Sequence, residues 1–294
     1  FPYTTLFRSA ICRRKKQPDV RKKEKWKPYL DYVLKEQEWL KEHQEQELKE
    51  IRSKDGLTLR AVYIPRENAK GTIICMHGYH STNDIEFVPE VRFLWNLGYS
   101  ILLPWQRSHG KSEGRYITYG VKERHDLKRW ILYTNRHLAA KNKDIFLCGI
   151  SMGCATTLMA AGLDLPDNVK GIIADCGFTS PWDIIKHVAK ERFHLPPFPL
   201  MYMVDLISEV VAGFGLKEVS IPEIMKRSKI PVLFIHGDAD DYVPMWMTIK
   251  NYEACVAKKE LYIVSGAGHA LAFSKDMEEG KRRIKNFINK YKTI

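Results

Sequence analysis

Short apolar runs alternate with longer amphipathic segments through most of the chain. The runs have the length and continuous apolar character of strands buried on both faces, and they are Thr72–Met76, Ser100–Leu103, Ile145–Cys148, Gly171–Ala174, Val232–Ile235 and Leu261–Val264. The segments that repeat apolar residues at helical spacing are 84–97, 120–138, 152–163, 245–257 and 274–291. Strands that alternate with helices predict an α/β fold, in which a mostly parallel sheet carries helices on both faces.

The chain before the first of these runs has three parts. Residues 10–27 contain many Lys and Arg side chains without apolar periodicity, which predicts a solvated basic arm. Residues 28–52 place Leu and Val at steps of three and four, which predicts an N-terminal helix. Lys54-Asp55-Gly56 then favours a turn, and the alternation over residues 57–63 predicts a β-hairpin at the edge of the sheet.

One interval, residues 179–229, breaks the alternation of strands and helices. It is rich in aromatic residues and Met, and it includes the Pro-rich stretch Leu195–Leu200. An interval of this length is too long for a simple connection in a compact domain. We therefore expect a helical cap, inserted over one end of the sheet within a single domain that spans residues 53–294.

The first nine residues, FPYTTLFRS, resemble the translation of a widely used short-read sequencing adapter. We therefore expect residues 1–9 to be foreign to the protein and its own sequence to begin near Ala10. A native N-terminus, with any signal or anchor it carries, is then expected to be missing. For this reason residues 1–9 do not contribute to the fold prediction.

The net charge of the 294-residue chain, +12, is concentrated near its start. Residues 1–27 carry +8, and the remaining 267 residues carry only +4. Strong positive charge favours nucleic acids or anionic membranes as partners, but here it lies outside the predicted fold. We expect no nucleic-acid partner, and we expect peripheral membrane contact through the basic arm.

The six cysteines include no Cys-x-x-Cys pair. Four of them, Cys75, Cys148, Cys154 and Cys176, lie in or beside apolar runs, where thiols act as small hydrophobic side chains. This pattern favours free thiols in a reducing compartment, the cytoplasm.

The sequence Gly149-Ile150-Ser151-Met152-Gly153 carries the clearest chemical signal. It follows a predicted strand and opens a predicted helix, which is the strand–turn–helix context of a nucleophilic serine. A serine at so sharp a turn adopts a strained backbone, and glycine on both sides avoids collisions. The start of the helix supplies amide groups and the positive end of a dipole to a developing oxyanion. We expect Ser151 to be a nucleophile.

A nucleophilic serine needs a base that accepts its proton. His269 lies on a loop between the last predicted strand and the last predicted helix, so it is placed to face the edge of the sheet that carries the serine. Three carboxylates, Asp238, Asp240 and Asp241, follow the strand that ends at residue 235. One of them is expected to hold the imidazole of His269.

From about Leu57 to Tyr291 the chain resembles the α/β-hydrolase superfamily, in its serine-hydrolase branch of esterase- and lipase-like proteins with a short N-terminal helix and a small cap. The stretches that carry the resemblance are His77–Tyr79, Arg107–Ser112, Gly149–Gly153, His236–Pro244 and Gly266–His269. The order of serine, aspartate and histidine along the chain is also that of the family. The resemblance implies an eight-stranded, mostly parallel sheet and a triad of Ser151, Asp240 and His269, with Asp241 and Asp175 as alternatives for the acid.

The resemblance also implies an oxyanion hole formed by the backbone N–H groups of Tyr79 and Met152. It implies no cofactor. No metal is expected, because His77 and His80 have no further ligands at a suitable spacing nearby. We expect His77 to brace the turn instead.

The family's D-x-R-G-H-G-x-S pattern is altered in this chain. Its leading Asp is replaced by Pro104 or Trp105, depending on the alignment, whereas Arg107 and the H-G-x-S residues are present. We expect the change to affect the bracing of a loop or the shape of the pocket rather than the triad.

These features predict a hydrolase that cleaves carboxylic esters or thioesters through an acyl-enzyme on Ser151. A serine peptidase or an acyltransferase that uses the same triad is the alternative. The expected partner is a small-molecule ester with an apolar acyl or alcohol part. Residues that could line its pocket, although such residues also build cores, are Tyr79, Trp105, Phe178, Trp182, Phe193, Phe198, Met201 and Met203.

Overall fold

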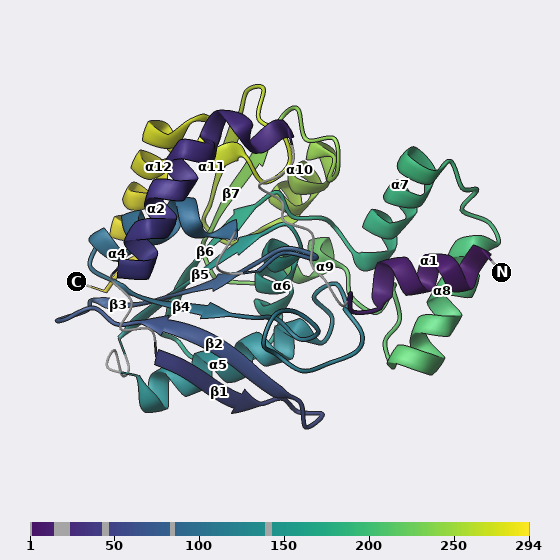
Figure 1. Cartoon of the computed structure of the whole chain (residues 1–294), viewed down its shortest axis with the longest axis horizontal. Helices are drawn as coiled ribbons and strands as arrows, with labels where there is room; N and C mark the ends of the chain where they lie inside the picture. The colour runs from purple at the N-terminus through teal and green to yellow at the C-terminus, as the bar shows by residue number, and fades with distance from the viewer. Residues whose placement is uncertain (1, 15–23, 43–46, 83–85, 139–142, 294) are drawn as a thin grey trace.

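The computed structural model of the chain describes residues 2–14, 24–42, 47–82, 86–138 and 143–293. Its centre is an eight-stranded sheet in the order β1-β2-β4-β3-β5-β6-β7-β8 (Figure 1). The strands are β1 (Glu47–Arg52), β2 (Thr58–Ile64), β3 (Gly71–Met76), β4 (Ser100–Pro104), β5 (Asp144–Ile150), β6 (Val169–Asp175), β7 (Val232–Gly237) and β8 (Lys259–Val264). All six predicted apolar runs form strands, and the eight-stranded, mostly parallel sheet is confirmed.

The pairing of the strands decides which loops meet. β1 and β2 pair antiparallel, whereas β4, β3, β5, β6, β7 and β8 pair in parallel. In the parallel block Met76 lies opposite Gly149, and Gly237 lies opposite Val264. The loops that follow β3, β5, β7 and β8 therefore open at one edge of the sheet, where open α/β sheets bind their ligands.

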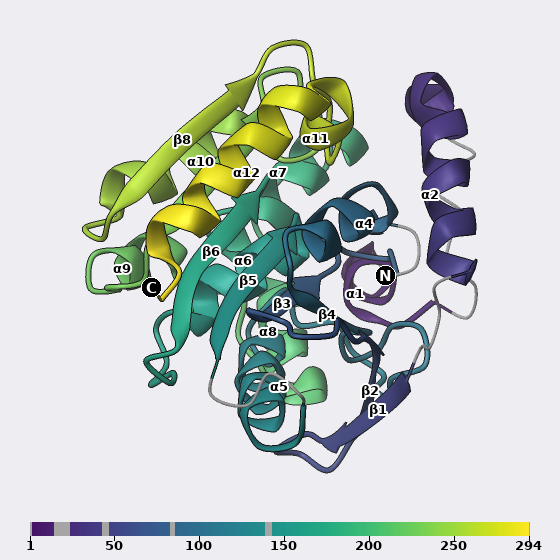
Figure 2. The same ribbon diagram turned by 90° about the vertical axis from the view of Figure 1, so that its left-hand side faces the viewer.

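Helices cover both faces of the sheet (Figure 2). One face carries α2 (Leu30–Glu42), α4 (Val88–Asn96), α11 (Ala272–Lys275) and α12 (Met277–Tyr291), and the other carries α5 (Glu123–His137), α6 (Met152–Ala160), α9 (Ile221–Met225) and α10 (Met245–Ala254). Side chains alternate between the two cores along each strand, so that Ile73 packs with the first group and Ile74 with the second. All six cysteines are free thiols, as expected.

The predicted helix over residues 28–52 is wrong in its second half. Helix α2 ends at Glu42, and residues 47–52 form β1, which pairs with β2 across the predicted turn. The apolar steps that favour a helix stop at Leu40, and pairing with a neighbouring strand outweighs local propensity in the segment that follows. The predicted turn is present, with Gly56 at a φ of 86°.

The basic segment 10–27 is not solvated at either of its ends, so that prediction is also corrected. Ile11 is fully buried, and Cys12 forms a β-bridge with Tyr116. The Arg13 guanidinium donates to the backbone oxygens of Gly110 and Ser112, both at 2.7 Å. At the other end, η2 (Glu24–Tyr29) buries Trp26, while residues 15–23 lie outside the described residues.

Residues 2–11 form α1 (Pro2–Ile11), which lies against the cap (Figure 1). Most of this helix consists of the residues that resemble an adapter. The cap consists of α7 (Pro181–Phe193), α8 (Leu200–Ile207) and the π-helical turn η3 (Ser208–Ala212), whereas α9, at the end of the predicted interval 179–229, packs on α6 and α10 beside the sheet. Figure 1 shows α7 and α8 standing clear of the sheet on one side. Among the described residues, no helix combines the length and the apolar character needed to span a bilayer.

A buried ion pair formed by Arg107 of the altered motif connects three parts of the fold. The Arg107 guanidinium donates to both carboxylate oxygens of Asp126 on α5, at 2.6 and 2.8 Å, and it also contacts Asp55 in the β1–β2 turn at 2.9 Å. The Arg107 and Asp126 side chains are about 95% buried. A buried bidentate pair fixes the relative positions of its elements, although its own net contribution to stability is small.

Replacing Arg107→Met is expected to lower the free energy of unfolding by about 3–5 kcal/mol, because Asp126 would stay buried without its principal counter-charge. Guanidinium unfolding curves measure the loss. The double variant Arg107→Met/Asp126→Leu should recover most of it. Arg60→Met, which breaks an exposed pair with Glu50, should cost less than about 1 kcal/mol. Equal losses in the single and double variants would contradict this account.

Candidate active site

Ser151 occupies the turn between β5 and α6 in a strained conformation, with φ 55° and ψ −116°. The flanking glycines make the turn possible. A Cβ atom on Gly153 would lie 1.7 Å from the Met76 oxygen of β3, and one on Gly149 would lie 2.4 Å from the Gly153 oxygen. A side chain at either position would push the helix away from the sheet, so the glycines are required by close backbone approach.

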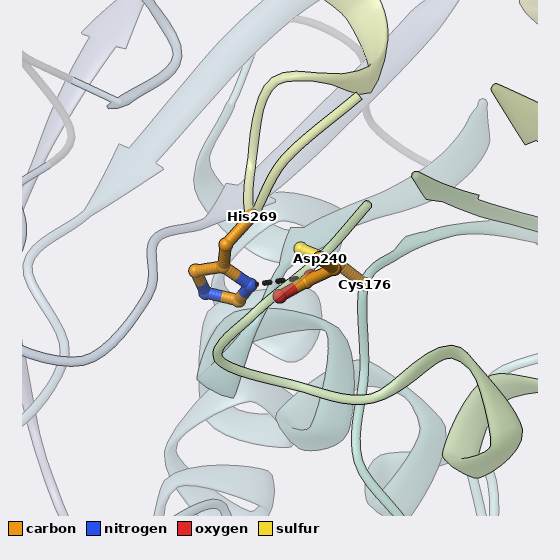
Figure 3. A group of neighbouring side chains, drawn as sticks. All are labelled: Cys176, Asp240 and His269. Atoms are coloured by element: carbon orange, nitrogen blue, oxygen red, sulfur yellow. Dashed lines mark hydrogen bonds and ion pairs between the residues drawn. The ribbon is translucent and has the colours of Figure 1, made fainter. Parts of the chain in front are cut away.

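The structure brings Ser151, His269 and Asp240 together from three different loops. Nε2 of His269 lies 2.9 Å from Oγ of Ser151, and Nδ1 lies 2.7 Å from Oδ2 of Asp240. Figure 3 shows the imidazole beside the carboxylate, with Cys176 behind them. A carboxylate at Nδ1 fixes the tautomer in which Nδ1 carries the proton. Nε2 is then left to accept the proton of the serine hydroxyl.

Asp240 is held as a carboxylate by donors on several sides. Its Oδ1 accepts from the Tyr242 amide at 2.8 Å and from the Val243 amide at 2.9 Å. Burial by itself raises the pKa of Asp240, but the charge of His269 and hydrogen bonds from His236, His269 and the Tyr242 amide outweigh it and hold the pKa well below its usual range. An ionised group at this position stabilises a positive charge on His269.

His236 is a component of the site that the sequence did not single out. It is fully buried, its Nε2 donates to the Val243 oxygen at 2.9 Å, and its Nδ1 shares a hydrogen bond with the Thr248 hydroxyl at 2.7 Å. Nε2 also lies 3.4 Å from Oδ2 of Asp240. His236 therefore ties the loop of the acid to α10. It opens the H-G-x-x-D pattern, and this position was the available signal.

The two alternative acids lie elsewhere. Asp241 is exposed and contacts Arg192 of the cap at 3.3 Å. Asp175 ends β6 and is buried, and its Oδ1 has no hydrogen-bond partner among the described residues. Burial raises the pKa of Asp175 to about 7, and the nearby charge of Asp240 adds to the effect, while His236 opposes it. Of the three carboxylates, Asp240 is therefore the one that contacts Nδ1 of His269.

The turn after β3 places Tyr79 at the site and is braced by two imidazoles. His77 donates from Nδ1 to the Gly78 oxygen at 2.8 Å and accepts the Gln106 amide at Nε2 at 3.0 Å. His109 accepts the His80 amide at Nε2 at 3.1 Å. These bonds fix the backbone of the turn. His109 and Gln106 belong to the altered motif, for which the sequence predicted an effect on loop bracing or pocket shape, and both contact the turn that carries Tyr79.

Met152 follows Ser151 directly, and Tyr79 lines the same cavity as the serine. Met152 is the first residue of α6, so its amide has no acceptor within the helix. Among the described residues, neither amide donates to a backbone oxygen elsewhere. Preorganised amides beside a nucleophile suit a developing oxyanion.

Glu86 approaches the serine from the same side. Its carboxylate accepts a hydrogen bond from the Gly78 amide. A Cβ atom on Gly78 would lie 3.0 Å from Oε1 of Glu86 and 3.2 Å from Cβ of Ser151. Gly78 therefore leaves the space in which the carboxylate and the serine come close, and the sequence gave no indication of this contact.

A cavity of about 560 Å³ opens above Ser151 and His269. Its apolar wall comes from α7 of the cap and from three tyrosines of the body, namely Ile184, Ile185, Val188, Phe193, Tyr79, Tyr119 and Tyr242. Of the residues expected to line a pocket, Tyr79 and Phe193 do so. Trp105, Phe178 and Met201 are buried in the cores, Trp182 is partly buried outside the cavity, and Phe198 and Met203 are exposed on the cap. Leu6 and Ser9 of α1 also line the cavity, as do the charged residues Arg14, Glu86, Arg192 and Asp241.

Cys176, Asp240 and His269 place possible metal-ligand atoms within 4.8 Å of one another (Figure 3). Burial raises the pKa of the Cys176 thiol well above its usual value, which disfavours the thiolate that a metal requires. Asp240 and His269 are bonded to each other. The chemistry of this donor set fits proton transfer better than metal binding.

The chain is similar to known proteins in sequence and in structure. The model of the prolyl oligopeptidase family matches residues 112–293. Protein YqkD of Bacillus subtilis (strain 168) is 28% identical over 239 residues, which cover 81% of this chain and 78% of that protein. A solved structure of the Pyrococcus furiosus esterase Pf2001 superimposes with a TM-score of 0.70 at 26% identity, and it covers 86% of this chain and 94% of the esterase.

The raised pKa of Asp175 predicts a pH-dependent loss of stability. The folded state keeps a proton on this carboxyl up to pH about 7, whereas the unfolded chain releases it near pH 4. Stability should therefore fall as pH rises between these values, by roughly 4 kcal/mol in total. Asp175→Asn should remove this part of the pH dependence in unfolding curves measured from pH 4 to 8.

The matched control for this prediction is Asp241→Asn, which changes an exposed neighbour of the acid. It should leave the slope of stability against pH as in the parent. If Asp175→Asn also leaves that slope unchanged, the buried carboxyl is not the group that titrates.

Proposed function

The chain belongs to the prolyl oligopeptidase family of α/β-hydrolase serine hydrolases, and from this premise we propose that it cleaves carboxylic esters through an acyl-enzyme on Ser151. One observation carries the proposal. The hydrogen bonds run without a break from Asp240 through His269 to the Ser151 hydroxyl, which faces a cavity with an apolar wall on the cap side. Such a chain is what an otherwise weak serine nucleophile needs.

The proposed reaction has two halves. In the first, Ser151 Oγ attacks the ester carbonyl while His269 Nε2 accepts its proton, and the same proton then passes to the leaving alcohol as the ester C–O bond breaks. In the second, a water molecule gives a proton to His269 Nε2 and attacks the acyl carbonyl; the bond between the acyl carbon and Ser151 Oγ then breaks, His269 returns the proton to Oγ, and the acid leaves. The amides of Tyr79 and Met152 would hold the oxyanion in both halves. Asp240 would balance the charge on the imidazolium.

Support for an ester substrate comes from the cavity and from a relative. The cap wall of the cavity is aliphatic and aromatic, which suits an apolar acyl or alcohol group. The Pyrococcus furiosus protein that shares the fold at 26% identity is an esterase by name.

A serine peptidase is the second candidate, because the family description names an oligopeptidase. An acyltransferase differs only in the acceptor of the acyl group. Matched nitrophenyl ester and nitroanilide substrates with the same acyl group separate the first two activities, and an added alcohol that is acylated in preference to water reveals the third.

Ser151→Ala is expected to lower turnover of short nitrophenyl esters by up to ~10⁶-fold and to abolish labelling by a fluorophosphonate probe. Asp240→Asn should lower turnover by about 10⁴-fold, because the imidazole loses its orientation and counter-charge. Asp241→Asn, its matched control, should stay within a few fold of the parent. Parent-like turnover of Ser151→Ala would overturn the proposal, and a larger loss with Asp241→Asn would reassign the acid.

Deleting residues 1–9 is expected to widen the cavity, because Leu6 and Ser9 form part of its lining. The profile of turnover against acyl-chain length should shift toward longer chains, while fluorophosphonate labelling of Ser151 persists. An unchanged chain-length profile would show that α1 does not limit the acyl group. Loss of labelling would show instead that α1 supports the site.

A further inference from the structure

Exposed apolar side chains are concentrated on the outer part of the cap. Of the eleven large hydrophobic residues that are exposed among the described residues, six lie within residues 198–211: Phe198, Tyr202, Met203, Leu206, Val210 and Val211. We refer to these six as the cap stripe. Phe198 and Val210 are 75% and 77% exposed, the two highest values of the eleven. A contiguous apolar patch of this kind on a surface marks a contact with a partner or a membrane.

The stripe follows from the helical spacing of α8 and η3. Tyr202, Leu206 and Val210 recur at four-residue steps along α8 and η3, so they share one side of this helical segment. Phe198 lies in the turn before α8, and its ring contacts that of Tyr202 at 6.0 Å. The opposite side, which includes Met201 and Val204, is buried in the cap. The segment is therefore apolar on both sides, and a helix of that kind is normally covered on both.

The acidic residues of this segment turn away from the stripe. Asp205 accepts the Leu216 amide at 2.7 Å. The carboxylate of Glu209 faces Gly215, where a Cβ atom would lie 3.0 Å from its Oε1. Both carboxylates are thus directed at the loop that follows η3 and away from the apolar face.

Lysines and aromatic rings border the stripe. Nζ of Lys217 lies 3.8 Å from the centre of the Trp182 ring and 4.4 Å from that of Tyr202, and Lys122 donates to the Ala212 oxygen at the end of η3. The ring of Trp182 contacts that of Tyr202 at 5.2 Å. Amphipathic rings and lysines beside aliphatic residues are the side chains that settle at a membrane interface.

We propose that the cap stripe docks on an anionic lipid surface, with its aliphatic and aromatic side chains in the interface and Lys217 and Lys122 toward the headgroups. The stripe belongs to the segment of α8 and η3, on the lobe that stands clear of the sheet (Figure 1). An apolar helix face flanked by cations binds lipid in proportion to its buried apolar area and to the attraction of anionic headgroups. The docking does not depend on ester cleavage.

The lobe that docks also forms the wall of the cavity. Phe193 at the end of α7 lines the cavity and is 57% exposed, and the contact of Trp182 with Tyr202 joins α7 to α8. A docked cap would therefore hold the cavity wall close to the lipid. This surface is separate from the basic arm of residues 10–27, whose expected membrane contact remains a prediction.

The test is flotation of the full chain with vesicles of phosphatidylcholine alone or with 30% phosphatidylserine. The chain carries Ser151→Ala, so hydrolysis of lipid cannot affect the result. Binding is expected with phosphatidylserine, and Phe198→Ser/Leu206→Ser/Val210→Ser should weaken it by at least about tenfold. Lys217→Gln should weaken it by about fivefold. The matched control Leu34→Ser/Leu48→Ser/Val256→Ser, which changes exposed residues elsewhere, should stay within about twofold.

Three results would overturn the proposal. The first is absence of binding by the parent chain, and the second is equal binding by the stripe variant and its control. The third is loss of binding only when the lysines of the arm are changed to Gln. Sedimentation without vesicles tests whether a second copy of the chain covers the stripe instead of lipid. A parent dimer that the stripe variant converts to monomer would assign the stripe to a second copy of the chain and would also overturn the lipid proposal.

Discussion

The close approach of the start of α6 to the end of β3 is the constraint on which the site depends. The helix can lie against the strand only because Gly153 has no Cβ, which would sit 1.7 Å from the Met76 oxygen. This approach projects Ser151 beside the turn that carries Tyr79, because β3 and β5 are neighbours in the sheet. The serine and the proposed oxyanion donors therefore meet within the body of the fold, and the cap shapes the cavity without assembling the reacting groups.

The turn after β3, which lies beside the serine, is held in place by residues that do not contact a substrate. The turn after β3 is a short backbone segment whose amides must point in fixed directions, and His77 and His109 fix them from two sides. Where the family's pattern has an aspartate, the chain has Pro104 or Trp105. Trp105 fills the space beside Gly110, since a Cβ on Gly110 would lie 2.1 Å from its ring. Arg107 then turns to Asp126 and Asp55. The altered motif thus keeps a bracing role through packing and a buried ion pair.

Local sequence patterns were sufficient to predict the elements whose structure depends on neighbouring residues. Continuous apolar runs identified the buried strands, and the glycines around Ser151 identified the turn. The errors fall where distant contacts decide the structure. Residues 47–52 have no strand pattern of their own and become a strand by pairing with β2, and Ile11 is buried through a bridge to the loop near residue 116. The sequence places His236 at the start of the loop of the acid, but its role depends on hydrogen bonds across that loop, which the pattern does not show.

Two buried carboxylates near the site show how the surroundings, rather than the residue type, decide its chemistry. Asp175 and Asp240 both follow strands of the parallel block, and burial alone would raise the pKa of either. Asp240 receives two backbone amides and contacts two imidazoles, so it stays ionised, whereas an oxygen of Asp175 has no partner among the described residues and its pKa rises to about 7. Ionising both would place like charges close together in a poorly solvated region. Keeping a proton on Asp175 thus preserves the single negative charge that a protonated His269 requires.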